Sequence, residues 1–437
     1  MFDRPYVVSW NLTYRCNLAC EHCYLDAGAR PLVATENFAD RSELGTEECF
    51  KVIDEIAAFA PECLTILTGG EPLLRRDILE IVRRAAERGL WVVVGTNGVR
   101  ITENVATHLA EAGARGLSLS LDALDPDRHD RFRKVRGAWQ NTVDGAAILN
   151  RTGLPFIVQT TAGAYNLGEL EAIADFAHDR LAAKVWNLYF LVPTGRGQFV
   201  SDMTAAQYDA VLASLYRIQR KYDRRMLVNA KCAPHVIKTV LEEGDAEARI
   251  RTYSGGAGGC PAGTHYMGIR PNGDVTPCPY LPVFAGSLRT ASLTDLWNTS
   301  ELFTGIRRRS SLGGRCGECE MNAQCGGCRA RAFGMSGDLM AEDPLCTHTP
   351  GKFAGSPLLT VQRPVRVEYG SESPATIAWD TDASARMKKI PAFVRGMVVK
   401  AVEDSCRRNG VNRVTSEELE KIRARMPTPK LFGREGA

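Results

Sequence analysis

Residues 15–24 are Arg15-Cys16-Asn17-Leu18-Ala19-Cys20-Glu21-His22-Cys23-Tyr24, a short segment of a 437-residue chain. The spacing of Cys16, Cys20 and Cys23 allows their thiolates to close on one small metal cluster. A [4Fe–4S] cube is normally held by four thiolates, so three would leave one iron without a protein ligand. An open metal position is typical of a catalytic site rather than a structural one. The other interpretations are three unrelated thiols or a zinc site that lacks a ligand.

The C-x3-C-x2-C spacing, followed by the aromatic Tyr24, resembles the signature of the radical S-adenosylmethionine (SAM) enzymes. In that family the free iron binds the amino and carboxylate groups of SAM. Reductive cleavage of SAM then yields a 5′-deoxyadenosyl radical. The resemblance implies that Cys16, Cys20 and Cys23 hold the SAM-binding cluster and that Tyr24 lies at the cofactor site.

The length of the chain predicts two or three domains, and 44% hydrophobic with 24% charged residues is typical of a globular protein. The formal charge of +3 gives no argument for nucleic acid as a partner. The first residues, 1–5, lack the pattern of a signal peptide, and no stretch approaches the length of a membrane span. We therefore expect a cytoplasmic protein without a membrane span.

In a reducing compartment the 14 cysteines are expected to be metal ligands rather than disulfides. Three lie in the first motif and eight lie between Cys232 and Cys346. The remaining Cys49, Cys63 and Cys406 are predicted to be ordinary buried thiols.

Apolar strands alternate with amphipathic helices over residues 1–230. The predicted strands are Tyr6–Leu12, Leu64–Leu67, Trp91–Val94, Leu117–Leu121, Pro155–Thr161 and Val185–Val192; the predicted helices are Thr46–Ala60, Asp77–Arg88, Thr102–Ala112, Gln140–Arg151 and Leu167–Arg180. The radical SAM core is a partial (β/α)6 barrel related to the TIM barrel, and the six strand–helix units match it. We therefore predict an α/β fold whose chemistry lies at the C-terminal ends of the strands.

Polar or glycine residues follow five consecutive predicted strands. Gly69-Gly70-Glu71-Pro72 resembles the family's GGEP motif, which binds the amino group of the SAM methionine. Glycines allow close backbone approach, and a carboxylate can pair with an ammonium. By the same resemblance, the candidate contacts to the ribose and carboxylate of SAM are Asn97, Ser120, Gln159 and Arg133.

The cysteine-rich segment, residues 231–350, resembles the SPASM extension, which holds two auxiliary [4Fe–4S] clusters. The resemblance assigns one cluster to Cys316, Cys319, Cys325 and Cys346, and the other to Cys260, Cys278 and Cys328, with Cys232 as a possible fourth ligand. The family pattern has C-x3-C where this chain has Cys325-Gly326-Gly327-Cys328, which leaves the ligand sharing open. Paired C-x2-C units also occur in zinc ribbons, so zinc is the alternative metal.

The Gly313–Cys319 and Cys325–Ala332 segments also look like the radical SAM enzymes of tetrapyrrole side-chain processing, the haem synthases and their relatives in haem d biosynthesis. Those haem synthases convert propionates to vinyl groups, with an electron donor such as flavodoxin or ferredoxin. The resemblance implies a tetrapyrrole substrate, and His235 and His265 are candidate haem-iron ligands. The alternatives are a maturase of a ribosomal peptide or partner protein, and a non-catalytic tetrapyrrole-binding scaffold.

The C-terminal residues are predicted to form a linker, 351–372, and a small helical domain, 373–437, with helices from Pro391 to about Asn409 and from a Thr415 capping box. Trp379 and residues 387–396 resemble the small C-terminal domain of the B subunit of light-independent protochlorophyllide reductase. Residues 384–437 hold 13 Lys and Arg against 6 Asp and Glu. This excess fits either an acidic ligand or a solvated helical surface.

Overall fold

The computed structural model describes residues 4–28, 42–61, 63–200, 203–222, 225–243, 250–251, 259–356, 361–362, 377–388, 399, 402–403 and 405–425. The chain divides into two compact units, residues 1–366 and 367–437. Within the described residues, none of the helices combines the length and the apolar character needed to cross a bilayer.

A ten-stranded sheet, in the order β11-β10-β9-β1-β2-β3-β4-β5-β6-β7, forms the centre of the first unit. Seven of its strands follow one another along the chain and are all parallel. They are β1 Val7–Asn11, β2 Leu64–Thr68, β3 Trp91–Gly95, β4 Gly116–Ser120, β5 Phe156–Ala162, β6 Val185–Phe190 and β7 Leu227–Lys231. The predicted α/β partial barrel is thus confirmed, and β7 is an additional parallel strand.

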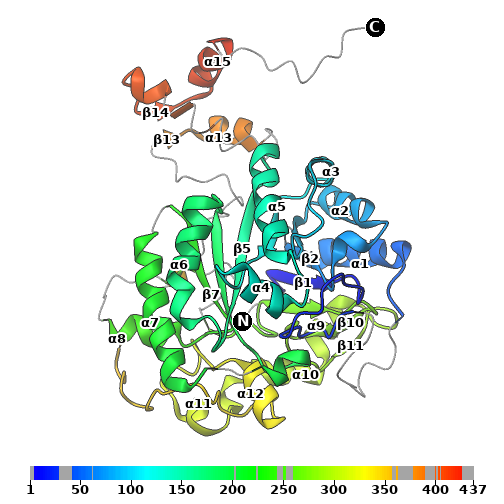
Figure 1. Ribbon diagram of the computed structural model, residues 1–437, viewed down its shortest axis with the longest axis vertical. Coiled ribbons are helices and arrows are strands. Elements are labelled where there is room, and N and C mark those ends of the chain that lie inside the picture. Colours follow the sequence, from blue (N-terminus) through cyan, green and yellow to red (C-terminus); the bar gives the residue numbers. More distant parts are fainter. Residues whose placement is uncertain are drawn as a thin grey trace. The chain divides into compact units, whose positions relative to one another are not determined.

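Helices cover the outer side of these strands (Figure 1). They are α1 Thr46–Phe59, α2 Ile78–Glu87, α3 Glu103–Glu111, α4 Pro126–Arg133, α5 Ala138–Thr152, α6 Leu170–Asp175 and α7 Ala205–Lys221, with η2 Pro72–Leu74, η3 Leu167–Glu169, η4 Phe176–Arg180 and η5 Gly195–Phe199 as short helical turns. The predicted helix Leu167–Arg180 is divided among η3, α6 and η4. Helix α4 was not predicted, because Phe132 is the only large apolar residue among its charged neighbours and no helical period is visible.

The main core lies between the strands and these helices, and it contains large, fully buried side chains such as Trp10, Trp186 and Phe156. Cys49 and Cys63 belong to this core, as expected for ordinary buried thiols. Because side chains alternate along a strand, the residues between the core residues face the inner side of the barrel.

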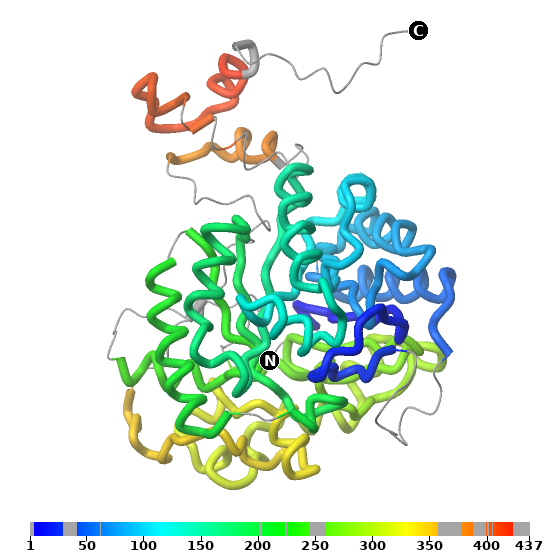
Figure 2. The backbone as a smooth tube through the Cα atoms, in the orientation of Figure 1, coloured from blue at the N-terminus to red at the C-terminus, as the bar shows by residue number. Residues whose placement is uncertain are grey.

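The cysteine-rich segment continues the same sheet. Strand β9 Tyr266–Ile269 lies parallel to β1, and β10 Asp274–Thr276 and β11 Gly286–Ser287 follow in antiparallel order. The rest of the segment contains α8 Val236–Glu242, α9 Leu293–Thr299, α10 Glu301–Arg307, η6 Arg309–Ser311, α11 Gly314–Glu318 and α12 Arg329–Ser336, and β8 Ile250–Arg251 pairs with β12 Val361–Gln362. Figure 2 accordingly places the first strand beside a segment more than 250 residues later in the chain.

The second unit has a small core of its own, formed by Ala383, Val402, Cys406, Val414 and Ile422. It contains α13 Thr381–Lys388, α15 Ser416–Arg425 and the parallel pair β13 Ala378–Trp379 and β14 Arg413–Val414. The Glu418 amide donates to Thr415 Oγ1 at 3.2 Å, so the predicted cap of the last helix is confirmed. The predicted helix from Pro391 lies mostly outside the described residues, as does most of the predicted linker.

Candidate functional site

The first three cysteines lie in the loop that follows β1, at the C-terminal end of the parallel strands. Backbone amides point at two of the sulfurs, since Leu18 N donates to Cys16 Sγ and Ala27 N donates to Cys23 Sγ, each at 3.4 Å. Burial raises the pKa of Cys16 to about 12 and also raises the pKa of Cys20. Such thiols ionise readily only when a metal ion supplies positive charge. The loop therefore fits a bound metal cluster.

Arg133 ties this loop to the end of β4. Its Nε donates to the Asp122 carboxylate at 2.7 Å, and its Nη1 lies 3.6 Å from Cys20 Sγ. Burial opposes ionisation of Asp122, but the adjacent guanidinium outweighs it and holds the pKa of this carboxyl below its usual value. Thr161 N donates to the second carboxylate oxygen at 2.8 Å. Arg133, predicted as a partner of the SAM carboxylate, thus has a protein carboxylate and a cysteine sulfur as partners.

The two glycines of the GGEP motif lie against the backbone just before Cys16. Gly70 N donates to Thr13 O, and Glu71 N donates to Arg15 O, each at 2.8 Å. A Cβ at Gly70 would stand 2.2 Å from Arg15 O, and Gly69 has a φ of +139°. Only glycine tolerates both the close approach and this backbone conformation. The motif is therefore fixed beside the cysteine loop.

The Glu71 carboxylate is fully buried and connects the ends of β2 and β3. It accepts hydrogen bonds from Leu73 N at 3.1 Å, Thr96 Oγ1 at 2.9 Å and Asn97 N at 2.9 Å. Burial raises its pKa to about 7 despite these donors. Pro72 follows as the first residue of η2. The structure thus gives the carboxylate a set of partners that the motif alone did not indicate, and its pairing with an ammonium stays a prediction.

The remaining predicted SAM contacts lie on neighbouring strands. Asn97 Nδ2 donates to Asn17 Oδ1 at 2.8 Å, which brings this side chain to the cysteine loop. Ser120 and Gln159 are register partners on β4 and β5. Because β5 continues to Ala162, Gln159 lies within its strand rather than at its end. Their contacts with SAM stay predictions.

Two aromatic residues of the cysteine loop point in different directions. Tyr24 Oη donates to Asn11 Oδ1 at 2.7 Å, and its ring centre lies 4.6 Å from that of Tyr280. The His22 ring stacks on Phe132, with 4.5 Å between ring centres and 2° between planes. The sequence interpretation overlooked His22, although an aromatic ring between two cluster cysteines was a signal that could have identified it.

One group of four cysteines lines a common cavity in the second half of the unit: Cys316, Cys319, Cys325 and Cys346. His235 also lines this cavity. A Cβ at Gly327 would stand 3.0 Å from Cys316 Sγ, so glycine leaves room for the sulfur there. The structure thus brings together the residues that the resemblance assigned to one cluster.

The second group of four cysteines lies in a separate cluster: Cys260, Cys278 and Cys328 are buried with Leu281 and Ile306, and the half-buried Cys232 packs against them. The Cys328 thiol lies beside the thiols of both Cys232 and Cys260. Cys232, which the resemblance offered as the fourth ligand, therefore lies with the other three. Its φ of +59° is unusual for a non-glycine residue and turns the chain directly after β7.

A buried polar network lies between the two cysteine groups. The Asp343 carboxylate accepts hydrogen bonds from Cys328 N at 2.7 Å and from Arg331 Nη1 at 3.0 Å, and His235 Nε2 lies 3.6 Å from it. The other imidazole nitrogen, Nδ1, lies 2.8 Å from Tyr208 Oη. Burial opposes ionisation of Asp343, but the Arg331 guanidinium dominates and lowers its pKa. One carboxylate thus contacts Cys328 of the second group and His235, which lines the cavity of the first.

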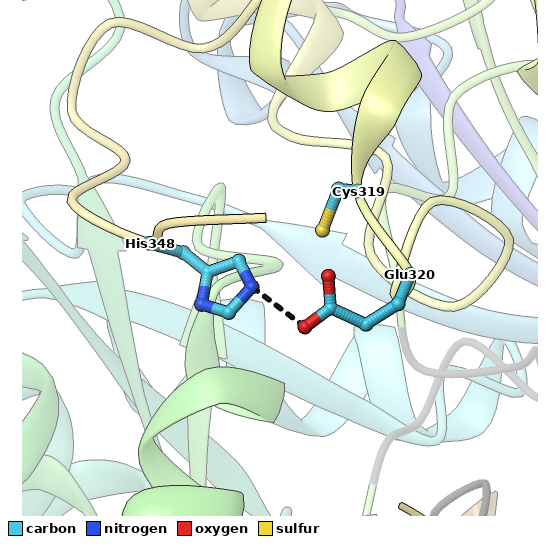
Figure 3. A group of neighbouring side chains, drawn as sticks. All are labelled: Cys319, Glu320 and His348. Carbon is cyan, nitrogen blue, oxygen red and sulfur yellow. Dashed lines mark hydrogen bonds and ion pairs between the residues drawn. The ribbon is translucent and has the colours of Figure 1, made fainter. Parts of the chain in front are cut away.

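A third set of possible ligands adjoins the first group. Cys319, Glu320 and His348 lie close enough to hold a metal ion (Figure 3). The Glu320 carboxylate accepts from Gly351 N at 2.7 Å and Phe353 N at 2.8 Å, and His348 Nε2 lies 3.0 Å away. These contacts outweigh burial and lower its pKa to about 2. Because the carboxylate already fastens the following loop, its structural role accounts for the arrangement.

The two histidines considered as haem-iron ligands are both buried. His235 lines the cavity of the first group and contacts Tyr208. His265 Nδ1 lies 2.9 Å from Thr264 Oγ1, and its carbonyl accepts a hydrogen bond from Tyr6 N. These contacts place both side chains within the protein framework, and neither gives a separate argument for iron ligation.

Sulfur-only donor sets of this kind suit iron–sulfur clusters, although four thiolates can also hold zinc. The comparison with protein families favours iron. Residues 10–177 match the model of the radical SAM superfamily, and residues 260–329 match SPASM, an iron–sulfur cluster-binding domain. Residues 379–423 match the proto-chlorophyllide reductase 57 kD subunit.

Several curated relatives extend over most of the chain. An AdoMet-dependent heme synthase of Methanosarcina barkeri is 36% identical over 80% of this chain and 99% of its own length. A pre-heme d1 synthase of Dinoroseobacter shibae is 31% identical over 78% and 85%, and the mycofactocin maturase MftC of Mycobacterium ulcerans is 32% identical over 83% and 92%.

Among solved structures, SuiB of Streptococcus suis bound to S-adenosylmethionine has a TM-score of 0.62 and 19% identity, covering 79% of this chain and 78% of that one. At this identity the likeness concerns the fold alone. The relatives and family models together decide the classification, including the cofactors SAM and iron–sulfur clusters. The chain belongs to the radical SAM superfamily and is a radical SAM enzyme with an iron–sulfur SPASM domain.

Proposed function

We propose that this enzyme uses SAM to modify the propionate side chains of a tetrapyrrole. The observation that carries the proposal is the 36% identity to an AdoMet-dependent heme synthase across 99% of that relative. The match of the second unit to a proto-chlorophyllide reductase subunit supports it independently. The proposed reaction removes one hydrogen atom, CO2 and one electron from each propionate to leave a vinyl group.

When bound, SAM and its cluster supply the 5′-deoxyadenosyl radical that takes the hydrogen atom. In the proposal, Cys16, Cys20 and Cys23 hold this cluster, and the amides of Leu18 and Ala27 donate to two of the sulfurs. Arg133 holds the loop through its contacts with Asp122 and Cys20. Rigid support of this kind keeps reacting groups oriented and excludes water.

The GGEP segment and its neighbours form the proposed SAM-binding edge. Gly69, Gly70, Glu71 and Pro72 lie beside the cysteine loop because their backbone pairs with residues 13–15. Asn97 reaches the same loop through Asn17. Tyr24, Ser120, Gln159 and Arg133 complete the proposed set.

The two cysteine quartets are proposed to hold auxiliary [4Fe–4S] clusters, one on Cys316, Cys319, Cys325 and Cys346, and one on Cys232, Cys260, Cys278 and Cys328. The cavity lined by the first four cysteines and the proximity of the thiols in the second four support this division. We further propose a cytoplasmic location and an electron donor such as flavodoxin or ferredoxin, since reduced cysteines and a low-potential donor suit such clusters. The proposed domains are residues 1–230, 231–350 and 373–437, joined by the linker 351–372.

The decisive experiment combines anaerobically reconstituted enzyme, SAM and a strong reductant, with and without iron-coproporphyrin III. Mass spectrometry should detect deoxyadenosine whose formation rises with the porphyrin, together with a product that has lost CO2. The Cys20→Ala variant is the matched control, and it should form neither product. If deoxyadenosine forms but the porphyrin neither binds nor changes, the tetrapyrrole proposal is wrong.

The second candidate function is modification of a ribosomal peptide, which the 32% identity to the maturase MftC favours. This candidate predicts no affinity for porphyrins and a covalent change in a small peptide substrate. The non-catalytic scaffold predicts no deoxyadenosine under any reducing condition, and membership of an enzyme superfamily argues against it. The same assay therefore separates all three.

A further inference from the structure

A group of aromatic and cationic side chains lies on the inner side of the barrel and shares only Tyr24 with the proposed SAM-binding edge. On β6, Trp186, Leu188 and Phe190 belong to the outer core, so Asn187 and Tyr189 face inward. On β7, Val228 and Ala230 pack against the same core, so Asn229 and Lys231 face inward as well. Tyr189 and Lys231 are register partners on these adjacent strands.

Tyrosine rings extend from this pair towards the first cysteine loop. The Tyr189 and Tyr280 ring centres are 6.3 Å apart, and those of Tyr280 and Tyr24 are 4.6 Å apart. These three tyrosines, like Lys231, are half-buried residues. Their rings form a continuous aromatic surface that a flat ligand could contact.

The chain places these residues between the two kinds of cysteine site. Tyr24 directly follows Cys23 of the first loop, whereas Lys231 directly precedes Cys232 of the second quartet. Tyr280 lies two residues after Cys278. A molecule bound on these rings would therefore lie between the proposed SAM-cleaving cluster and one proposed auxiliary cluster.

A second cation, Arg270, adjoins the group from the end of β9. Its side chain is only 4% exposed, and burial lowers its pKa, while Tyr14, Tyr24, Cys23 and Asp274 act in the opposite direction. Guanidinium and ammonium groups both bind carboxylates through charge-assisted hydrogen bonds. Lys231 and Arg270 thus add a preference for anions to an aromatic surface.

Two buried amides near the rings have polar atoms without a partner among the described residues. They are Nδ2 of Asn11, whose Oδ1 accepts from Tyr24, and Oδ1 of Asn229, whose Nδ2 donates to Asn187. Asn11 is 0% exposed and Asn229 is 3% exposed. Buried polar atoms are normally hydrogen-bonded, so an unsatisfied pair here points to a polar ligand.

We infer that Tyr24, Tyr189, Tyr280, Lys231 and Arg270 form the substrate subsite, which holds a flat aromatic molecule against its rings and binds its carboxylates through Lys231 and Arg270. The inference rests on the proposed function, since it assigns this subsite to the tetrapyrrole. Aromatic rings contribute contact area, and ammonium and guanidinium groups form charge-assisted hydrogen bonds with carboxylates. A porphyrin with several propionates combines both features.

The test measures binding of iron-coproporphyrin III to the anaerobic holoenzyme by absorbance titration. Lys231→Met should weaken binding about tenfold to a hundredfold, because one charged hydrogen bond is lost. Lys231→Arg should restore most of the affinity. The matched control is Lys184→Met, the same substitution at an exposed lysine directly before β6, and it should bind as tightly as the wild type.

Variants at two further positions keep the test decisive if Lys231→Met fails to bind its iron–sulfur clusters, since Lys231 adjoins the proposed ligand Cys232. Arg270→Gln should weaken porphyrin binding by a similar factor. Tyr189→Leu should weaken it several-fold, whereas Tyr189→Phe, which keeps the ring, should not.

The two failures have different signatures. If the wild type does not bind the porphyrin, the proposed function and this inference are both wrong. If the wild type binds it and Lys231→Met and Arg270→Gln bind equally well, the tetrapyrrole proposal stands and the subsite assignment is wrong.

Discussion

The first cysteine loop and the two cysteine quartets are built in different ways. Cys16, Cys20 and Cys23 lie within eight residues, and side chains from neighbouring strand ends hold their loop from outside. The quartets draw on residues from Cys232 to Cys346, and one buried carboxylate, Asp343, contacts Cys328 of one quartet and His235 beside the other. A short motif brings its metal ligands together by itself and needs few contacts from other segments. A site whose ligands are spread over more than a hundred residues depends on a buried polar network to hold those segments together.

The prediction with the largest expected effect distinguishes the first cysteine loop from the quartets by the iron content and deoxyadenosine formation of two variants. Cys20→Ala should remove about four iron atoms per chain and all deoxyadenosine formation, because the SAM-binding cluster is lost. Cys325→Ala should also remove about four iron atoms but still form deoxyadenosine, because the first loop is intact. Iron analysis and mass spectrometry of anaerobically prepared variants check both. A Cys325→Ala variant with unchanged iron would contradict the assignment of the first quartet.

The next prediction tests whether the quartets depend on the Asp343 carboxylate. Asp343→Ala leaves the Arg331 guanidinium buried without its carboxylate partner, and breaking a buried ion pair costs about 3–5 kcal/mol in the free energy of unfolding. The adjacent Glu342→Ala is the matched control. Glu342 pairs with Arg315 at side-chain exposures of 38% and 40%, so its loss should cost about 1 kcal/mol or less. Equal shifts in the thermal unfolding midpoints of the two variants would show that the network does not fix the quartets.

The support of the first loop is tested by a single added methyl group. In Gly70→Ala the new Cβ would meet Arg15 O at 2.2 Å, so the backbone before Cys16 must move. Overpacking of this kind costs about 1–3 kcal/mol, and we expect a matching fall in SAM cleavage because the loop is displaced. Gly168→Ala is the control, because its Cβ would meet nothing within 4 Å. Normal SAM cleavage by Gly70→Ala would mean that the loop tolerates the shift.

The sequence predicted the local part of this architecture well. Periodic apolar residues located six of the parallel strands within about two residues, and the spacing of Cys16, Cys20 and Cys23 pointed to their common site. The resemblance to SPASM also grouped the distant cysteines as the structure brings them together. Capping by Thr415 was visible because a cap is a local pattern.

Contacts between distant segments could not be predicted in the same way. The pairing of Arg133 with Asp122, the partners of Glu71 and the network around Asp343 depend on which strand ends and loops meet, and no spacing encodes that. The pairing of β9 with β1 has the same origin, because it joins residues about 260 positions apart. Helix α4 could not be predicted from apolar periodicity, because nearly all of its residues are polar.

The smallest expected effect concerns the carboxylate that connects the ends of β2 and β3. Burial raises the pKa of Glu71 from 4.5 to about 7, against the hydrogen bonds from Asn97, Leu73 and Thr96. Between these values the folded chain retains a proton that the unfolded chain has lost. The contribution of this group to the free energy of unfolding therefore falls as pH rises from about 4.5 to about 7, and it is constant above that.

Glu71→Gln should remove this dependence. Between about pH 5.5 and about pH 7.5 the free energy of unfolding of the wild type should fall by about 2 kcal/mol relative to that of the variant. This difference corresponds to a few degrees in the thermal unfolding midpoint. Glu103→Gln, at a carboxylate that is 66% exposed, is the matched control and should follow the wild type. If the Glu71→Gln and wild-type midpoints change with pH by the same amount, the folded carboxyl ionises near its ordinary pKa. The connection between the GGEP segment and Asn97 is then held by an ionised carboxylate, and the first loop shares with the quartets a dependence on buried charge.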